Sequence, residues 1–163
     1  MPCFLHNCQE KLKNEIGERR LNLIEADVLE KEPAELLRQP YKLVANIPYY
    51  ITGAIVEKFL SAEAQPTAMT LLVQKEVAER IARDQKESIL SLSVKVYGDP
   101  KYVKTVPAGA FSPPPKVDSA ILTIQNISLN NFEGPGHEKR FFSFVRAGFA
   151  HKPREETAYG FNE

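Results

Sequence analysis

The sequence predicts an α/β fold with a mostly parallel sheet and helices on both faces. The main observation is that short apolar runs, typical of buried strands, alternate with amphipathic stretches, typical of helices. The chain has 163 residues, of which 43% are hydrophobic and 26% charged, so it can bury the core of one such domain and is not disordered throughout. The last two apolar runs follow each other without a long helix between them, which predicts an antiparallel hairpin at one edge of the sheet.

The first half of the chain contains two predicted strands, Leu21–Asp27 and Tyr41–Asn46. The second of them is stopped by Pro48. Thr52 is a candidate N-cap for a helix over Ala54–Ala62, whose apolar side chains share one face. Two less regular stretches are predicted as a helix end with a turn and as a connector of helical character: 11–20 and 28–38.

The second half of the chain adds three predicted strands and three predicted helices. Ser88 is placed to cap the helix that ends at Gly98. The residues 151–163 have no apolar period and are expected to form a frayed tail. In chain order the predicted elements are a strand at Thr67–Gln74, helices at Lys75–Arg83 and Ile89–Gly98, strands at Tyr102–Val106 and Val117–Gln125, and a helix at Glu138–Ala150.

Charge and cysteine usage exclude several classes of protein. Lys and Arg together number 21, as do Asp and Glu, so the net charge is zero and any contact with nucleic acid must come from a local patch. The apolar runs are too short to span a membrane, and the N-terminus lacks the pattern of a secretory signal, so we expect a cytoplasmic protein without membrane contact. Cys3 and Cys8, with His6 between them, are too few ligands for zinc, so we expect no metal site.

The segment Asn46–Tyr49 (Asn-Ile-Pro-Tyr) follows a predicted strand at the carboxyl edge of the sheet, where α/β folds bind ligands. The side-chain oxygen of Asn46 and the main-chain carbonyl of Ile47 can accept two hydrogen bonds from one amino group. Pro48 has a fixed φ and aims that carbonyl, while Tyr49 offers a flat face to a base. The same four residues also suit an ordinary turn, so this segment alone leaves both readings open.

A second aromatic residue, Phe111, stands just before the three prolines 113–115, which lead into the last predicted strand. As a purely structural feature, these prolines shape the turn of the hairpin. As part of a site, the stiff turn would hold Phe111 out as a second stacking wall.

Four segments together resemble the rRNA adenine N6-dimethyltransferases, the family that dimethylates two adjacent adenines near the 3′ end of small-subunit rRNA. The resemblance covers about 21–152, and the segments occur in the order typical of the family. They are NIPYYITGAI (46–55), LLVQKEVAERI (71–81), ILSLSVKVYGDPKYVKTVPAGAFSPPPKVDSAIL (89–122) and FFSFVRAGFAHK (141–152). The resemblance implies a seven-stranded, Rossmann-like class I methyltransferase sheet, followed by a small helical domain.

The resemblance also implies roles for individual residues. Asp27, at the end of its predicted strand, matches the acidic residue that reads the adenine amino group of the methyl donor, S-adenosylmethionine. Asn46 and the carbonyl of Ile47 would hold the target amino group, between the rings of Tyr49 and Phe111. No general base is needed, because hydrogen bonds orient the amino lone pair toward the methyl group. The candidate catalytic residues are therefore Asn46, Ile47, Pro48, Tyr49 and Phe111, and the candidate donor-binding residues are Asp27 and Asn46.

The sequence departs from the family pattern at both ends. The glycine-rich loop that would approach the methionine end of the donor has no counterpart, and neither has the acidic residue that would bind its ribose. Beyond residue 152, the basic run of the family gives way to Pro153–Glu156. We therefore expect a chain truncated at both ends and inactive by itself, with a partial catalytic domain over 1–126. The residues 127–163 would form the start of a helical rRNA-binding domain and the tail.

The expected partner is small-subunit rRNA or the immature small ribosomal subunit, bound by a monomer. One alternative is a large-subunit rRNA adenine methyltransferase of the macrolide-resistance type, which shares the Asn-Ile-Pro-Tyr and Phe-x-Pro-x-Pro elements. The residues at 73–81 (VQKEVAERI) and 113–120 (PPPKVDSA) favour the small-subunit enzyme. The other alternative is a non-catalytic RNA-binding or ribosome-assembly remnant that keeps the base pocket without the donor site.

Overall fold

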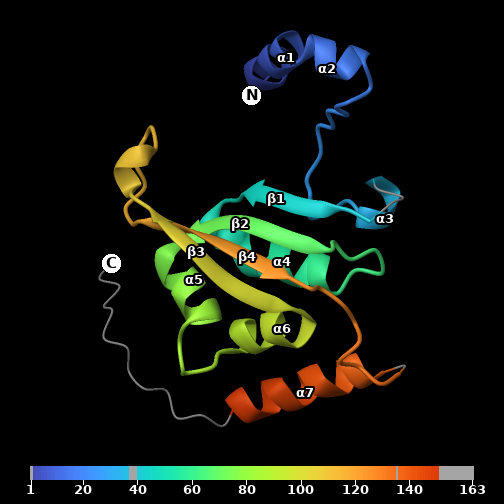
Figure 1. The fold of residues 1–163 in the computed structure, drawn as a ribbon, viewed down its shortest axis with the longest axis vertical. Helices are drawn as coiled ribbons and strands as arrows, with labels where there is room; N and C mark the ends of the chain where they lie inside the picture. Colours follow the sequence, from blue (N-terminus) through green and yellow to red (C-terminus); the bar gives the residue numbers. More distant parts are fainter. Residues whose placement is uncertain (1, 37–39, 135, 151–163) are drawn as a thin grey trace.

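The computed structural model describes residues 2–36, 40–134 and 136–150, with side chains from residue 6 onward (Figure 1). Its elements in chain order are α1 (Pro2–Lys11), α2 (Lys13–Gly17), α3 (Pro33–Leu36), β1 (Lys42–Asn46), the 3-10 turn η1 (Tyr49–Ile51), α4 (Thr52–Leu60), β2 (Ala68–Gln74), α5 (Lys75–Ala82), α6 (Ile89–Tyr97), β3 (Asp99–Val106), the 3-10 turn η2 (Ala108–Ala110), β4 (Ser119–Gln125) and α7 (His137–Ala150). The tail predicted at 151–163 lies outside the described residues.

The four strands form one sheet in the order β1-β2-β4-β3. β1 and β2 are parallel, whereas β4 runs antiparallel to both β2 and β3. The predicted hairpin at one edge is therefore confirmed. The prediction of a mostly parallel sheet is wrong for the described strands, because the short connection after β3 returns the chain antiparallel and β4 then inserts between β2 and β3.

The strand predicted at Leu21–Asp27 does not form. This stretch pairs with no strand, and Ile24 keeps 47% of its surface exposed. An apolar run becomes a strand only where a neighbour pairs with its backbone groups, and β1 pairs with β2 alone in the described part of the chain. The connector of helical character is confirmed, since it contains α3.

Helices cover one face of the sheet. Leu71 of β2 and Leu122 of β4 are opposite each other and fully buried, in one cluster with residues of α4, α5 and α6. On the other face Val44 of β1 is 77% exposed, and α1 and α2 lie away from the sheet (Figure 1). The prediction of helices on both faces is therefore wrong for the described residues.

Two predicted helix caps have opposite outcomes. The Ser88 hydroxyl accepts a hydrogen bond from the main-chain N–H of Ser91 at 3.1 Å, as predicted for a capping residue. Thr52, in contrast, does not cap α4, because the chain runs from η1 directly into the helix and Ile51 takes the N-cap position. Thr52 is instead buried, and its hydroxyl oxygen lacks a hydrogen-bond partner within the described structure.

The last helix, α7, packs against α6 through aromatic rings and one hydrogen bond. Tyr97 stacks on Phe142 with 5.9 Å between ring centroids, and its hydroxyl donates to the carboxylate of Glu138. The predicted helix over Glu138–Ala150 is thus confirmed as α7. A domain boundary between residues 126 and 127 remains a prediction.

Candidate active site

The segment Asn46–Tyr49 lies where β1 ends. Asn46 is the last residue of β1, pairs with Leu72 of β2 and has an exposed side chain. Ile47 is 8% exposed and belongs to the core, so only its backbone is available to a ligand. Pro48 has φ −58° and ψ 135°, which is extended backbone, and it turns the chain from the strand into η1.

Tyr49 is anchored to a residue 70 positions further along the chain. Its hydroxyl lies 2.7 Å from the hydroxyl oxygen of Ser119, and either group can be the donor. Ser119 is fully buried and is the first residue of β4, where it pairs with both Gln74 and Val106. The ring of Tyr49 is therefore held where β2 and β3 end and β4 begins.

Phe111 lies in the loop between β3 and β4, after η2. Its main-chain N–H donates to the carbonyl oxygen of Ala108 at 3.2 Å, and its ring is half-buried. The N–H of Ala108 donates to the Asp118 carboxylate at 2.9 Å, so the start of the loop is joined to its end. The peptide bond between Ser112 and Pro113 is cis. The loop of Phe111 thus ends at Ser119, the residue that the Tyr49 hydroxyl contacts.

Asp27 makes its own local hydrogen bonds. One oxygen of its carboxylate accepts a hydrogen bond from the Leu29 N–H at 2.8 Å, and its carbonyl accepts one from the Glu30 N–H at 3.1 Å. Asp27 therefore closes a turn of its own. No hydrogen bond joins it to Asn46 in the described part of the chain, and the role of the two residues in donor binding remains a prediction.

The edge of the sheet where β2 ends carries charges of both signs. A pocket of about 490 Å³ opens between the end of β2 and the loop of Phe111. Lys75 and Lys116 line it together with three carboxylates, those of Glu76, Glu79 and Asp118. This wall is therefore not the single-sign basic patch that long-range attraction of a phosphate backbone requires.

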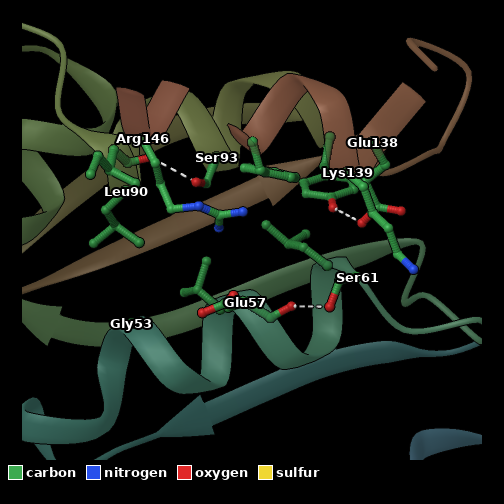
Figure 2. Close-up of a pocket in the computed structure, with 13 residues that line it drawn as sticks. Gly53, Glu57, Ser61, Leu90, Ser93, Glu138, Lys139 and Arg146 are labelled. Atoms are coloured by element: carbon green, nitrogen blue, oxygen red, sulfur yellow. Dashed lines mark hydrogen bonds between the residues drawn. The ribbon is translucent and has the colours of Figure 1, made fainter. Parts of the chain in front are cut away.

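A second pocket of about 500 Å³ lies away from all the predicted site residues, between α4, α6 and α7 (Figure 2). Apolar side chains such as Val56, Leu60 and Phe142 line it, and Arg146 of α7 reaches into the space facing α4 (Figure 2). Burial and the hydrogen bond to Glu138 raise the pKa of Tyr97 on its wall well above the ordinary value, so the phenol stays protonated.

A metal-ligand cluster and a membrane-spanning helix are both absent from the described residues. Among the residues whose side chains are described, no three His, Cys, Asp or Glu side chains cluster as metal ligands do. None of the described helices combines the length and apolar character needed to cross a bilayer.

Sequence reasoning missed Asp118 and Ser119. Ser119 contacts the Tyr49 hydroxyl, and the Asp118 carboxylate accepts the Ala108 N–H, but neither residue was singled out from the sequence. The available signal was a pair of short polar residues at the point where the proline turn enters a strand, because such side chains readily bond to neighbouring backbone groups.

Comparisons with known proteins place the chain in a family. Residues 2–156 match the model of the ribosomal RNA adenine dimethylases. The chain is 49% identical over 130 residues to ribosomal RNA small subunit methyltransferase A of Dehalococcoides mccartyi, in a match that covers 78% of this chain and 44% of the relative. The corresponding protein of Fusobacterium nucleatum is 40% identical over 132 residues, with 80% and 50% covered. The chain thus spans about half the length of the curated relatives it matches.

The fold is also similar to those of solved RNA methyltransferase structures. The chain resembles the 23S rRNA methyltransferase ErmE with a TM-score of 0.75 and 31% identity, over 92% of this chain and 59% of that one. It resembles a dimethyladenosine transferase from Plasmodium falciparum with a TM-score of 0.71 and 28% identity, over 86% and 50%. The four-stranded sheet with its one-sided helices is therefore an incomplete Rossmann-like class I methyltransferase fold. On its sequence match and on its fold, the chain belongs to the ribosomal RNA adenine dimethylase family.

Proposed function

We propose that this chain supplies the base-binding part of an enzyme that dimethylates N6 of two adjacent adenines near the 3′ end of small-subunit rRNA, with S-adenosylmethionine as methyl donor. The observation that carries the proposal is the 2.7 Å contact between the hydroxyls of Tyr49 and Ser119. It joins the Asn46–Tyr49 segment to the strand that follows the Phe111 loop. The substrate would be rRNA in the immature small subunit, bound by a cytoplasmic monomer.

The chemistry assigned to this chain is orientation. The side-chain oxygen of Asn46 and the carbonyl of Ile47 each accept one N–H of the target amino group. That pair of hydrogen bonds turns the nitrogen lone pair out of conjugation with the ring. Tyr49 and Phe111 stack on the two faces of the extruded adenine and exclude water from it. S-adenosylmethionine, when bound, supplies a methyl group on a positively charged sulfur.

The residues present fit only one part of that donor. The carboxylate of Asp27 is exposed, and one of its two oxygens accepts no hydrogen bond within the described chain, so it can accept one from an adenine amino group. The glycine turn and the ribose-binding carboxylate of the family have no counterpart in this sequence. We therefore propose that the chain by itself binds the donor weakly and does not turn over.

The test replaces the matching region of the Dehalococcoides mccartyi relative with this chain. The hybrid is given labelled S-adenosylmethionine and either immature small subunits or large-subunit rRNA. We expect dimethyladenosine in the small-subunit rRNA alone. Binding of rRNA without methyl transfer, by a folded hybrid that binds the donor, would support the non-catalytic remnant and contradict the proposal.

One observation favours a second candidate function. The likeness to the 23S rRNA methyltransferase ErmE has a TM-score of 0.75, and its alignment covers 92% of this chain. Under this alternative the same pocket would receive an adenine of large-subunit rRNA. Label found only in the large-subunit rRNA of the same assay would support it.

A further inference from the structure

We propose that Asp118 and Ser119 are positioning residues that set the separation between the two walls of the adenine pocket, Tyr49 and Phe111. This inference rests on the proposed function, because it names what holds that site in shape. Neither residue is expected to touch the base. They act through the residues that do.

Ser119 fixes the first wall. Its hydroxyl lies 2.7 Å from the hydroxyl of Tyr49, at the far end of the tyrosine side chain. Ser119 is fully buried, and its backbone is paired on both sides, with Gln74 and with Val106. A phenol bonded at its tip to so rigid a group cannot swing about its Cα–Cβ bond without breaking that contact, so the side chain is held in one rotamer before a base arrives.

Asp118 fixes the second wall. Its carboxylate accepts the Ala108 N–H at 2.9 Å, and the Ala108 carbonyl in turn accepts the Phe111 N–H at 3.2 Å. The Asp118 carbonyl accepts the N–H of Lys75, the first residue of α5, at 3.0 Å. The loop is therefore closed at its base against the body of the fold, while the prolines stiffen the part beyond Phe111.

The two walls thus depend on two consecutive residues at the start of β4. Their spacing is set by the sheet and not by the separate preferences of two loops. When the two walls are already held apart, the protein loses less conformational entropy on binding a base than when the walls must close around it. Removing either contact should weaken capture of the base without changing the atoms that contact it.

The test uses the 163-residue chain and an RNA hairpin that carries 2-aminopurine, a fluorescent adenine analogue, at the target position. Stacking between two aromatic rings quenches the analogue. Ser119→Ala and Tyr49→Phe each remove one hydrogen bond. We therefore expect each to weaken the affinity for the RNA, measured by quenching, about 2- to 10-fold. The affinity of the double variant should be no lower than that of either single variant. Asp118→Ala should behave similarly, whereas Asp118→Asn, which keeps an acceptor for the Ala108 N–H, should restore binding.

Ser91→Ala is the matched control. Ser91 is also fully buried and hydrogen-bonded, but its bonds cap α6 with Ser88. Its loss should lower the thermal midpoint of unfolding and leave quenching unchanged. Losses in Ser119→Ala and Tyr49→Phe that add in the double variant, or a folded Ser119→Ala that quenches as wild type does, would overturn the inference.

A measurement without RNA separates this inference from the function it rests on. In wild-type protein with labelled tyrosines, NMR scalar couplings should report a single χ1 rotamer for Tyr49, and in Ser119→Ala they should report averaging between rotamers. A wild-type chain that quenches no labelled RNA refutes the base site. Equal χ1 averaging in the two proteins refutes the positioning role by itself.

Discussion

Gly98 lies at the joint between α6 and β3, where replacement by Ala should destabilise the fold. An added Cβ would lie 2.6 Å from the carbonyl oxygen of Gln125, and 3.1 Å and 3.3 Å from side-chain carbons of Ile124 and Ile127. Gly98 has φ −171°, which any residue adopts, so the cost comes from the clash alone. The oxygen belongs to the residue that pairs with Asp99 at the start of β3, so relief requires a shift of the β3–β4 ladder.

Forcing a methyl group into such a space costs about 1–3 kcal/mol. The lower chain entropy of unfolded Ala offsets about 0.4–1 kcal/mol of this, so the net loss should be about 1.3 kcal/mol and at most about 2.6 kcal/mol. With a urea m-value of about 2 kcal/mol per molar, the unfolding midpoint should fall by roughly 0.6 M and at most by about 1.3 M. Far-UV circular dichroism in a urea titration of the 163-residue chain measures this shift.

Gly53→Ala is the matched control. Gly53 lies inside α4, and a Cβ there would meet nothing within 4 Å. The same chemical change should therefore raise stability by about 0.5–1 kcal/mol through helix propensity. A Gly98→Ala midpoint equal to or above that of Gly53→Ala would refute the argument from the Gln125 contact.

Three further predictions concern the site and the surface. Asn46→Ala, made in the hybrid enzyme described above, should lower kcat about 10²-fold with little change in rRNA affinity, which single-turnover methylation and filter binding measure; an unchanged rate would contradict its role. Phe111→Ala should weaken binding of the labelled hairpin by about 1–3 kcal/mol, whereas Phe111→Trp should be tolerated; Phe111→Leu working as well as Trp would make Phe111 a core residue. Hydrogen bonds from Lys95 and then Ser91 hold the pKa of Glu87 below its usual value, so its contribution to stability is complete above about pH 4.5 and is lost as the pH falls through the folded pKa. Glu87→Gln should therefore reduce urea resistance at pH 7, and the difference from wild type should shrink as the pH falls below about 4.5; a difference as large at pH 2 as at pH 7 would contradict this.

Local signals in the sequence predicted local structure well. Ser88 caps α6 because a serine before an apolar helix can bond its own first turn, and no distant residue is needed. Leu21–Asp27 has an equally good strand pattern, but a strand depends on a neighbour, which the pattern does not contain. For the same reason the antiparallel insertion of β4 between β2 and β3 could not be predicted from periodicity.

In the candidate site, too, local features could be predicted from the sequence and contacts between distant residues could not. The roles proposed for Asn46, Tyr49 and Phe111, accepting a hydrogen bond and stacking on a base, could be predicted from residue type and from the flanking prolines. The contact that joins the Asn46–Tyr49 segment to the strand after the Phe111 loop links Tyr49 to Ser119, 70 positions apart, and no spacing rule contains it. Whether Asp27 approaches Asn46 was also not predictable, because its position depends on a stretch that forms no strand.

The place of β4 in the sheet has a consequence for synthesis of the chain. β3 pairs with β4 and with no other described strand, so half of the sheet cannot form until β4 has emerged from the ribosome. β2 ends at Gln74 and β4 begins at Ser119, which is 119 − 74 = 45 residues later. At about 5–20 residues per second, the exposed edge of β2 waits roughly 2–9 s for its partner. The nascent chain therefore presents an unpaired, apolar edge during translation, and the contact between Tyr49 and Ser119 that shapes the candidate site is among the last to form.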